Sequence, residues 1–271
     1  MTASQDARAA AAAPIIEIDN LIAQYDDRII LNGISLKVRQ GERLLICGGS
    51  GCGKTTLLRH MIGLQQPASG RIVIDGEDIT SGDAAAMERV QRKIGMSFQS
   101  GALFGSLTLG ENVALPLEEY TALPAAMIDT LVRLKLSMVS LAGFEDFMIS
   151  ELSGGMKKRA ALARSIALDP KILFFDEPSA GLDPITSAEL DQLIVQINES
   201  LGTTIVVVSH ELASIFAIAD RIVMLDSVTK KVIADGSPVE LRDHHPDPTV
   251  HAFFNRKPRP PEGAGRKDNG H

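Results

Sequence analysis

The chain has few of the residues that nucleic-acid binding requires. Among its 271 residues are no Trp, two Tyr and nine Phe, which leaves few aromatic platforms on which single-stranded bases could stack. Acidic residues outnumber basic ones by 34 to 27, and the formal net charge is -7. The chain as a whole therefore lacks the basic footprint of a nucleic-acid binder. We expect no nucleic acid among its partners, and only a local basic patch could provide such contact.

Two further absences concern metal modules and membranes. Cys47 and Cys52 have no nearby Cys or His pair that would complete a zinc site, so neither a metal module nor a disulfide framework is indicated. A reducing compartment fits this cysteine usage best. No run of about 18 apolar residues is present, the minimum for a spanning helix, and the N-terminal MTASQDARAAAAAP lacks the apolar centre of a secretory signal. We expect a cytosolic chain that meets a membrane only through a partner.

The order of apolar segments predicts an α/β fold. At 45% hydrophobic and 23% charged residues the composition is that of a globular protein. Apolar strands followed by helices imply a mostly parallel sheet that is covered on both faces. The predicted strands are 29–38, 43–47, 71–75, 94–98, 171–175 and 204–208, with a hairpin made of 222–225 and 231–234. The predicted helices are 56–63, 125–139, 156–168, 187–198 and one that begins at Pro238.

The ends of the chain and one internal segment depart from this pattern. Residues 1–14 and 257–271 are expected to be a disordered N-terminal tail and a flexible C-terminal tail, because they offer little to bury. A single domain would span 15–256. The segment from Gln99 to Leu152 lacks apolar strands, so we expect a helical subdomain over about 99–165. Phe253 and Phe254 precede the C-terminal tail, and we expect these two rings to dock on a partner surface.

A phosphate-binding loop is the most specific motif in the chain. Residues 48–55 read GGSGCGKT and match G-x-x-x-x-G-K-[ST], between an apolar strand and a predicted helix. Glycines let backbone N–H groups turn toward an anion, and the helix start adds its positive end. Lys54 can reach the β- and γ-phosphates of a nucleotide, and the Thr55 hydroxyl can ligate Mg²⁺. We read Cys52 as a small residue tolerated in the loop rather than a nucleophile. The residues assigned to nucleotide binding here are Gly48, Gly49, Ser50, Gly51, Cys52, Gly53, Lys54, Thr55 and Thr56.

A pair of carboxylates follows a second apolar strand. In KILFFDEP, Asp176 and Glu177 come directly after the hydrophobic run. A carboxylate at the carboxyl end of a parallel strand points into the same crevice as the phosphate loop. Asp176 would hold Mg²⁺, and Glu177 would orient the attacking water or accept its proton. Taken alone, the pair could equally be carboxylates at the start of a helix.

LSGGM, from Leu152 to Met156, lies between these two motifs and resembles the signature of ATP-binding cassette (ABC) ATPases. The resemblance extends from Ile16 to about Phe254. It implies the P-loop ABC ATPase fold, in which a mostly parallel sheet carries an antiparallel β-subdomain and an inserted α-helical subdomain, with ATP and Mg²⁺ as cofactors. It also implies a sandwich of two copies of the chain, in which Ser153, Gly154 and Gly155 contact the γ-phosphate held by the other copy. On residue chemistry alone, SGG is an anion site at a helix start or an ordinary Ser N-cap.

The resemblance assigns further residues one by one. Gln99 matches the glutamine that touches Mg²⁺ or water, His210 the histidine that contacts the γ-phosphate, and Tyr25 the aromatic that stacks on adenine. Asp183, in the segment SAGLD, matches the loop that crosses the dimer near the partner's catalytic glutamate. Without the resemblance these residues are a polar strand end, a capping histidine, an ordinary tyrosine and a helix start.

Two features of the signature helix depart from the family pattern or need interpretation. Met156 stands where the family has Gln, which removes a polar contact but leaves the backbone anion site intact. The run of Lys157, Lys158 and Arg159 is interpreted as a solvated helix start that faces phosphate.

Taken together, the residue matches of the resemblance imply catalytic roles for Glu177, His210 and Gln99, and metal binding by Thr55, Gln99 and Asp176.

A narrower resemblance concerns the cargo. The segments FQSGALFGSLT (98–108), ENV (111–113), PL (116–117), SGGMKKRAALARSIALDP and VHAFFN are similar to the ATPases of Mce/Mla-type bacterial lipid transporters. Gly105 departs from the polar residue expected at its position. The resemblance implies an integral-membrane permease, an MCE substrate-binding protein and a small accessory subunit as partners, at the cytoplasmic face of the inner membrane. Hydrolysis would power phospholipid transport.

Two other readings of the cassette stay open. One is the ATPase of another ABC importer. The other is a soluble ABC ATPase that acts on nucleic acid, which the absence of coiled-coil or zinc insertions disfavours.

Overall fold

The structure is a computed structural model that describes residues 14–258. Residues 1–13 of the expected N-terminal tail lie outside the described residues, and Pro14 is the first residue of a strand. Residues 259–271 of the expected C-terminal tail also lie outside them. Within 14–258, no helix combines the length and apolar character that crossing a bilayer requires.

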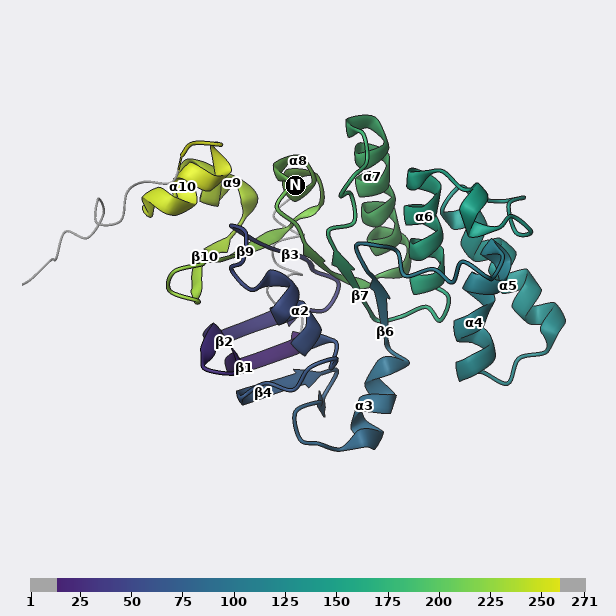
Figure 1. Cartoon of the computed structure of the whole chain (residues 1–271), viewed down its shortest axis with the longest axis horizontal. Coiled ribbons are helices and arrows are strands. Elements are labelled where there is room, and N and C mark those ends of the chain that lie inside the picture. Colours follow the sequence, from purple (N-terminus) through teal and green to yellow (C-terminus); the bar gives the residue numbers. More distant parts are fainter. Residues whose placement is uncertain (1–13, 259–271) are drawn as a thin grey trace, which may run out of the picture.

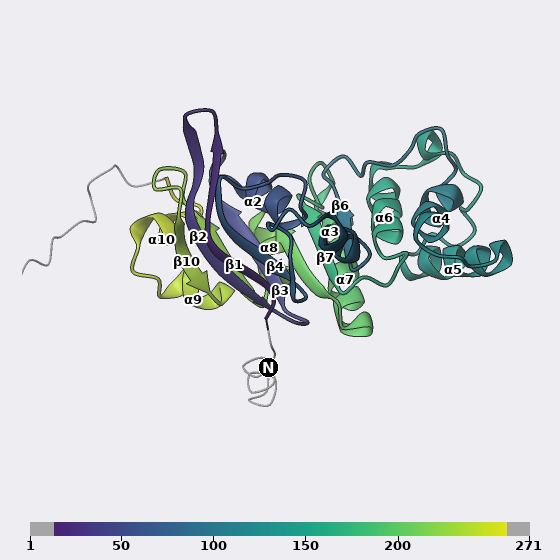
Figure 2. The same cartoon turned by 90° about the horizontal axis from the view of Figure 1, so that it is seen from below.

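Two β-sheets occupy the centre of the molecule (Figure 1). The smaller sheet is antiparallel, in the order β2-β1-β4-β5, and its β1–β2 hairpin projects from the body (Figure 2). Its strands are β1 (Pro14–Tyr25), β2 (Arg28–Arg39), β4 (Ser69–Ile74) and β5 (Glu77–Asp78). The larger sheet has the order β10-β9-β3-β8-β7-β6 and is parallel except for β10. Its strands are β3 (Arg43–Gly48), β6 (Ile94–Ser97), β7 (Ile172–Asp176), β8 (Thr204–Val208), β9 (Arg221–Leu225) and β10 (Val232–Gly236).

The helices are distributed unevenly around these sheets. Those between β6 and β7 gather at one end of the molecule, and the last two lie at the opposite end (Figure 1). The helices are α2 (Lys54–Met61), α3 (Ala84–Gln91), α4 (Leu109–Tyr120), α5 (Ala125–Met138), the 3₁₀ turn η1 (Ile149–Glu151), α6 (Gly154–Ser165), α7 (Pro184–Leu201), α8 (Leu212–Ile218), α9 (Pro238–Asp243) and α10 (Pro248–Phe254).

The larger sheet is buried on both faces, as its unbroken apolar strands require. Successive residues of each strand point to opposite sides. Leu45 and Phe175 therefore join the core formed with the later helices, whereas Leu44 and Phe174 join the core formed with α2 and the smaller sheet. The mostly parallel sheet with an added antiparallel sheet confirms the fold class that the sequence indicates. This packing fixes the carboxyl ends of β3, β6, β7 and β8, where the candidate site residues follow.

Pattern reasoning identifies the strands of the larger sheet and the predicted hairpin, but it misses β1. The apolar alternation in β1 breaks at Asp19 and Asn20, where the pairing register with β2 shifts between Ile18 and Leu21. Asn20 has φ 45°, the left-handed conformation of a bulge residue. The short helices α3, α8 and α10 carry too few turns for a helical period to stand out.

The aromatic pair near the end of the described chain packs inside this molecule. Phe254, on α10, is 3% exposed, and its ring centroid lies 6.1 Å from that of Phe216 on α8. Arg242, on α9, stacks over the Phe216 ring, with its guanidinium carbon 5.4 Å from the ring centroid. The expectation that the pair docks on a partner is therefore wrong for Phe254, because its own chain already buries the ring. Phe253 is only partly buried against the same core.

Candidate nucleotide site

The phosphate loop connects β3 to α2 and owes its shape to glycine. Gly48, Gly51 and Gly53 have φ of 140°, 70° and 100°, a region that L side chains rarely adopt. A Cβ on Gly48 would lie 2.3 Å from the Leu225 carbonyl oxygen on β9, whereas nothing lies within 4 Å of one on Gly49. The inner side of the loop is thus packed against the sheet. Its outer side, at 49–51, is open to a ligand.

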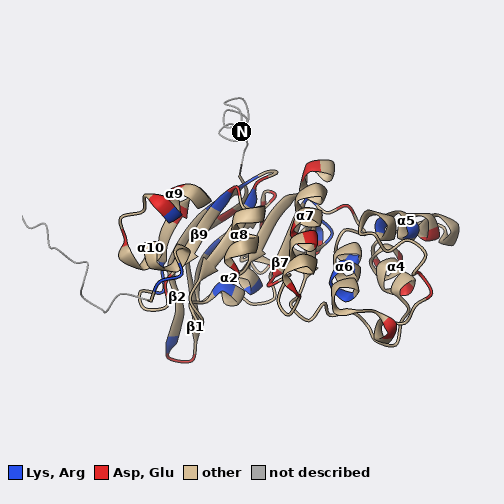
Figure 3. Ribbon diagram, turned by 90° about the horizontal axis from the view of Figure 1, so that it is seen from above, with Lys and Arg blue, Asp and Glu red and all other residues tan. Residues whose placement is uncertain are grey.

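Lys54 curls back over this loop from the first turn of α2. Its Nζ donates to the Gly48 carbonyl oxygen at 3.0 Å and lies 3.4 Å from that of Gly49. The ammonium is thus held by neutral backbone carbonyl groups beside the loop. Neither α2 nor α6 contains an acidic residue, and both carry basic ones (Figure 3). The loop, the lysine and the helix start therefore fit a phosphate group.

The two cysteines are unsuited to nucleophilic chemistry. Both thiols are free and buried. Burial raises the pKa of Cys47 and of Cys52 above the ordinary thiol value, and for Cys52 the nearby Lys54 charge opposes that rise. A thiol with a raised pKa is a poor nucleophile, which agrees with the reading of Cys52 as a small loop residue.

Thr55 and Asp176 meet although they lie 121 positions apart. Asp176 ends β7 and is 8% exposed, and its Oδ1 accepts a hydrogen bond from the Thr55 hydroxyl at 3.2 Å. Burial raises the pKa of the Asp176 carboxyl, and the Thr55 hydrogen bond acts in the opposite direction. Oxygen donors of this type are the ligands that Mg²⁺ prefers. The pair fits a magnesium ion that completes its coordination with nucleotide phosphates and water.

Glu177 and His210 form the second pair of the site. Glu177 Oε1 lies 2.7 Å from His210 Nδ1, and Glu177 Oε2 accepts the His210 backbone N–H at 3.4 Å. The Glu177 backbone N–H donates to the Val208 carbonyl oxygen, 2.8 Å away, at the end of β8. Glu177 has φ 49°, a strained conformation for a residue with a side chain, which is typical of functional positions. The carboxylate is thus held in place from two sides.

Gln99 lies just beyond β6, at the same edge of the larger sheet as the end of β7. It follows the strand and is exposed, and its backbone carbonyl oxygen accepts a hydrogen bond from Lys158 Nζ at 2.6 Å. Burial lowers the pKa of Lys158, while the charges of Asp176 and Glu177 raise it. Lys158 is therefore partly buried and bonded to its own chain, whereas the sequence suggests a helix start open to solvent. The sequence contains no signal that links it to a loop 59 positions away.

Ser153 and Asp183 act as helix caps within the chain. Ser153 Oγ accepts the Met156 N–H at the start of α6, at 3.3 Å, and Asp183 Oδ1 accepts the N–H groups of Ile185 and Thr186 at the start of α7. Between residues 14 and 258, no hydrogen bond joins either side chain to the phosphate loop. Gly154 and Gly155 open α6 beside the exposed Ser153. Contact of these residues with a nucleotide stays a prediction.

Tyr25 lies at the end of β1, next to the turn of the projecting hairpin. It is 44% exposed, and its hydroxyl donates to Gln65 Oε1 at 2.5 Å. The following strand passes the phosphate loop, since side-chain atoms of Ile30 and Leu31 lie against the position of a Gly53 Cβ. Stacking of Tyr25 on adenine stays a prediction. Thr56, in the first turn of α2, is partly buried.

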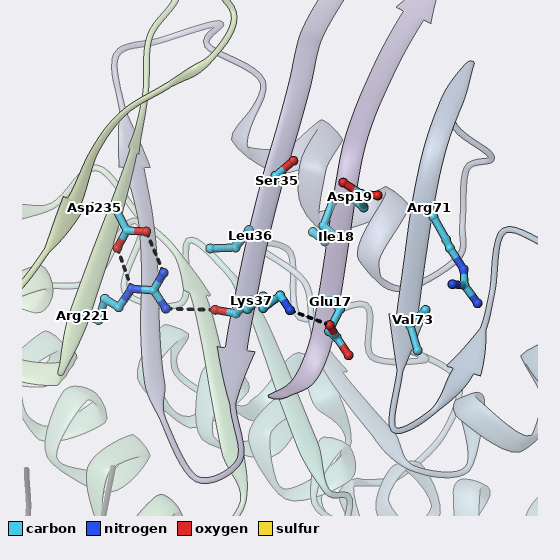
Figure 4. Close-up of a pocket in the computed structure, with 10 residues that line it drawn as sticks. All are labelled: Glu17, Ile18, Asp19, Ser35, Leu36, Lys37, Arg71, Val73, Arg221 and Asp235. Carbon is cyan, nitrogen blue, oxygen red and sulfur yellow. Dashed lines mark hydrogen bonds and ion pairs between the residues drawn. The ribbon is translucent and has the colours of Figure 1, made fainter. Parts of the chain in front are cut away.

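A groove of about 560 Å³ lies elsewhere, between the smaller sheet and the β9–β10 hairpin (Figure 4). Four of its charged residues are paired with one another, Arg221 with Asp235 and Lys37 with Glu17, and Arg71 pairs with Asp78, which does not line the groove. No residue of the phosphate loop lines this groove. It is therefore distinct from the nucleotide site.

The fold and the site define an ATP-binding cassette, and comparison with known proteins gives the same result. The model of the family described as "ABC transporter" matches residues 31–180. The chain belongs to the ABC transporter family, and it is an ATPase. The fold is shared with the dimeric, post-hydrolysis structure of the ATP-binding cassette MJ0796 bound to ADP and Pi, with a TM-score of 0.74 and 30% identity over 82% of this chain and 98% of that one.

Two curated relatives are similar over most of the chain. The intermembrane phospholipid transport system ATP-binding protein MlaF of Escherichia coli (strain K12) is 44% identical over 90% of this chain and 89% of its own length. The probable ribonucleotide transport ATP-binding protein mkl of Mycobacterium tuberculosis (strain H37Rv) is 38% identical over 89% of this chain and 66% of its own length.

Proposed function

We propose that the chain is the ATP-hydrolysing subunit of a transporter that moves phospholipid at the bacterial inner membrane. Hydrolysis is supported by two contacts at the carboxyl ends of the adjacent strands β7 and β8. Thr55 donates to Asp176, and Glu177 contacts His210. The cargo is supported by the 44% identity to MlaF over 90% of the chain. Both the site and the similarity span the whole cassette rather than one motif.

The residues divide the chemistry of hydrolysis among them. The phosphate loop and Lys54 bind the β- and γ-phosphates, and charge stabilisation is the main contribution a protein makes to phosphoryl transfer. Thr55, Asp176 and Gln99 would hold Mg²⁺, which supplies neutralisation of the phosphate charge. Glu177 orients the attacking water and takes its proton. His210 holds the Glu177 carboxylate in position and would contact the γ-phosphate.

A second copy of the chain completes the site. Ser153, Gly154 and Gly155 start α6 and are open or only partly buried, and no phosphate loop of the same chain reaches them. A helix start of this kind favours an anion. In a sandwich of two copies, it would contact the γ-phosphate on the other copy, with Asp183 near the crossing. The related cassette MJ0796 has a dimeric structure.

The membrane partners follow from the same proposal. We assign a permease as the direct partner, with an MCE substrate-binding protein and a small accessory subunit in the assembly, and the cassette attached to the cytoplasmic face. Phe104 is 51% exposed, and it lies on the loop that links Gln99 to α4. An exposed aromatic at this place suits contact with a permease and would pass the state of the site to it.

Purification from the native host in a mild detergent tests the assignment. We expect a tagged full chain to recover a multi-spanning membrane protein, and mass spectrometry to find phospholipid in the complex. Reconstituted in phospholipid vesicles, the complex should hydrolyse ATP. Recovery of free nucleotides or another solute in place of lipid would contradict the cargo. Salt-dependent DNA binding in a gel-shift assay, without a membrane protein, would contradict the transporter.

A further inference from the structure

Two basic side chains of α6 hold the loop that follows β6. Lys158 Nζ donates to the Gln99 carbonyl oxygen at 2.6 Å. Arg164 donates to the carbonyl oxygens of Ala102, at 2.9 Å, and Gly101, at 3.2 Å. The Arg164 guanidinium carbon also lies 5.9 Å from the centroid of the Phe104 ring. The loop from Gln99 to Phe104 is thus attached to one helix at several points.

The loop conformation depends on these attachments. Gly101 has φ 78° and Ala102 has φ 49°. A left-handed conformation is unfavourable for alanine because its Cβ approaches the following carbonyl oxygen, so the loop sequence alone does not favour this shape. Carbonyl groups outside a sheet also need donors from elsewhere. The side chains of α6 provide those donors.

Lys158 is also within electrostatic reach of the carboxylates of the site. The strands β6 and β7 are paired in parallel, with Ser97 opposite Phe175. The loop of Gln99 and the pair Asp176 and Glu177 therefore emerge side by side. Asp176 and Glu177 are the charged groups whose fields act on the Lys158 ammonium. The Lys158 ammonium is thus bonded to the backbone of one loop and attracted by the acidic residues that follow the neighbouring strand.

We propose that Lys158 is a positioning residue for hydrolysis: its ammonium fixes the Gln99 backbone beside Asp176 and Glu177. The inference rests on the proposed function to the extent that Gln99 acts there on Mg²⁺ or water. Lys158 belongs to α6, whose first residues would meet the nucleotide of the other copy. Through its bond to Gln99, Lys158 connects that helix to the hydrolytic residues of its own chain. Displacement of α6 would move Gln99.

Neighbouring lysines provide a matched control. Lys157 precedes Lys158 on α6 and is also partly buried, but within residues 14–258 its side chain makes no hydrogen bond or ion pair. Replacement of either lysine by Met removes one positive charge and keeps the length of the stem. A difference between Lys157→Met and Lys158→Met therefore reports the position of the charge rather than its loss.

The kinetic test uses the full chain in its ATP-hydrolysing form. We expect Lys158→Met to lower kcat about tenfold, within the range of a misplaced catalytic group, and to leave the KM for ATP within about twofold because the phosphate loop is intact. Lys157→Met should retain the parent kcat, and Lys158→Arg should restore most of it. If Lys158→Met kept the kcat of the parent, or raised the KM for ATP without lowering kcat, the proposal would be overturned.

A spectroscopic test reports the loop without relying on turnover. The chain has no Trp, so Phe104→Trp introduces a single fluorophore on the loop, beside Arg164. In that background, Lys158→Met and Lys158→Gln should change the emission maximum and anisotropy without nucleotide, whereas Lys157→Met should not. Unchanged emission in both Lys158 variants would overturn the positioning role. If Glu177→Gln kept full turnover while Lys158→Met still changed the emission, the proposed base would be wrong and the role of Lys158 would stand.

Discussion

Glu177 and His210 face each other across the ends of two paired strands, with 2.7 Å between Glu177 Oε1 and His210 Nδ1. The strands are β7 and β8, whose last residues, Asp176 and Val208, are opposite each other in the sheet. Because both strands are buried, their ends form a rigid base for the pair. The contact leaves the carboxylate oriented before any ligand arrives. This preorganisation is what a residue that positions water requires.

Removal of the Lys54 ammonium tests phosphate binding. Lys54→Ala should weaken ATP binding about 10- to 100-fold, because a hydrogen bond to a charged group contributes about 1.5–3 kcal/mol. Equilibrium titration with a fluorescent ATP analogue measures the change. Lys37→Ala serves as the control, since Lys37 lies in the separate groove of Figure 4. Equal affinity in the Lys54 variant and the parent would contradict the role.

A pair of glycine substitutions tests the shape of the phosphate loop. Gly48→Ala should lower the free energy of unfolding and abolish nucleotide binding, because its Cβ would meet the Leu225 carbonyl oxygen at 2.3 Å and its φ is 140°. Gly49→Ala has no atom within 4 Å of the new Cβ and should be stable within about 1 kcal/mol. Urea unfolding of both variants gives the comparison. Equal stability of the two would show that the loop is not packed as described.

The buried carboxyl of Asp191 predicts a pH dependence of stability. Asp191, on α7, is 3% exposed, and its Oδ1 has no hydrogen-bond partner among the described residues. Burial raises the pKa of Asp191 to about 6, and the charge of Glu211 adds to the rise while a Ser214 hydrogen bond opposes it. The folded state therefore binds more protons than the unfolded state between pH 4 and pH 6, so this group's contribution to stability falls as the pH rises through that window.

Asp191→Asn removes this titration and tests the sign. The variant should gain stability over the parent as the pH rises from about 4 to about 6, by on the order of 2 kcal/mol, and the gain should then stay constant to pH 8. Urea unfolding at several pH values gives the unfolding free energies of variant and parent. The contributions of the other carboxyl groups are common to both proteins and cancel in the difference. A difference that does not change with pH would contradict the prediction.

The aromatic packing of the last helix predicts an unequal effect of two substitutions. Phe254→Ala should cost about 3–5 kcal/mol, the range for a buried Phe, because its ring packs edge-on against Phe216. Phe253→Ala should cost less, since that ring is only partly buried. Chemical denaturation of each variant measures the loss. A larger loss in Phe253→Ala would instead favour a docking role for Phe254 outside the chain.

Sequence reasoning locates residues whose chemistry is written in contiguous motifs. The loop from Gly48 to Thr55 and the pair Asp176 and Glu177 follow strands that are apolar throughout, so both their type and their place at the sheet edge can be predicted. The same reasoning does not detect β1, because a bulge at Asn20 breaks its alternation. Nor does it predict that α4 continues through Pro116, since proline usually ends a helix.

Other parts of the site depend on contacts between distant segments. Lys158 reads as one residue of a basic run, and only the packing of α6 against the Gln99 loop shows its partner. Asp191 carries no signal of burial in the sequence, and the structure buries it on α7, which packs against α8. Ser153 and Asp183 differ again, since their predicted ligand would come from a second copy. A motif identifies such residues, but among residues 14–258 no hydrogen bond joins them to the phosphate loop.

Steady-state hydrolysis by Glu177→Gln tests the central claim most directly. The substitution keeps the size of the side chain and the contact with His210, but it removes the group proposed to take the proton from water. We expect ATP turnover to fall by at least about 100-fold, while binding of a fluorescent ATP analogue stays within about threefold of the parent. Turnover near the parent rate, at unchanged affinity, would show that Glu177 is not the group that takes the proton.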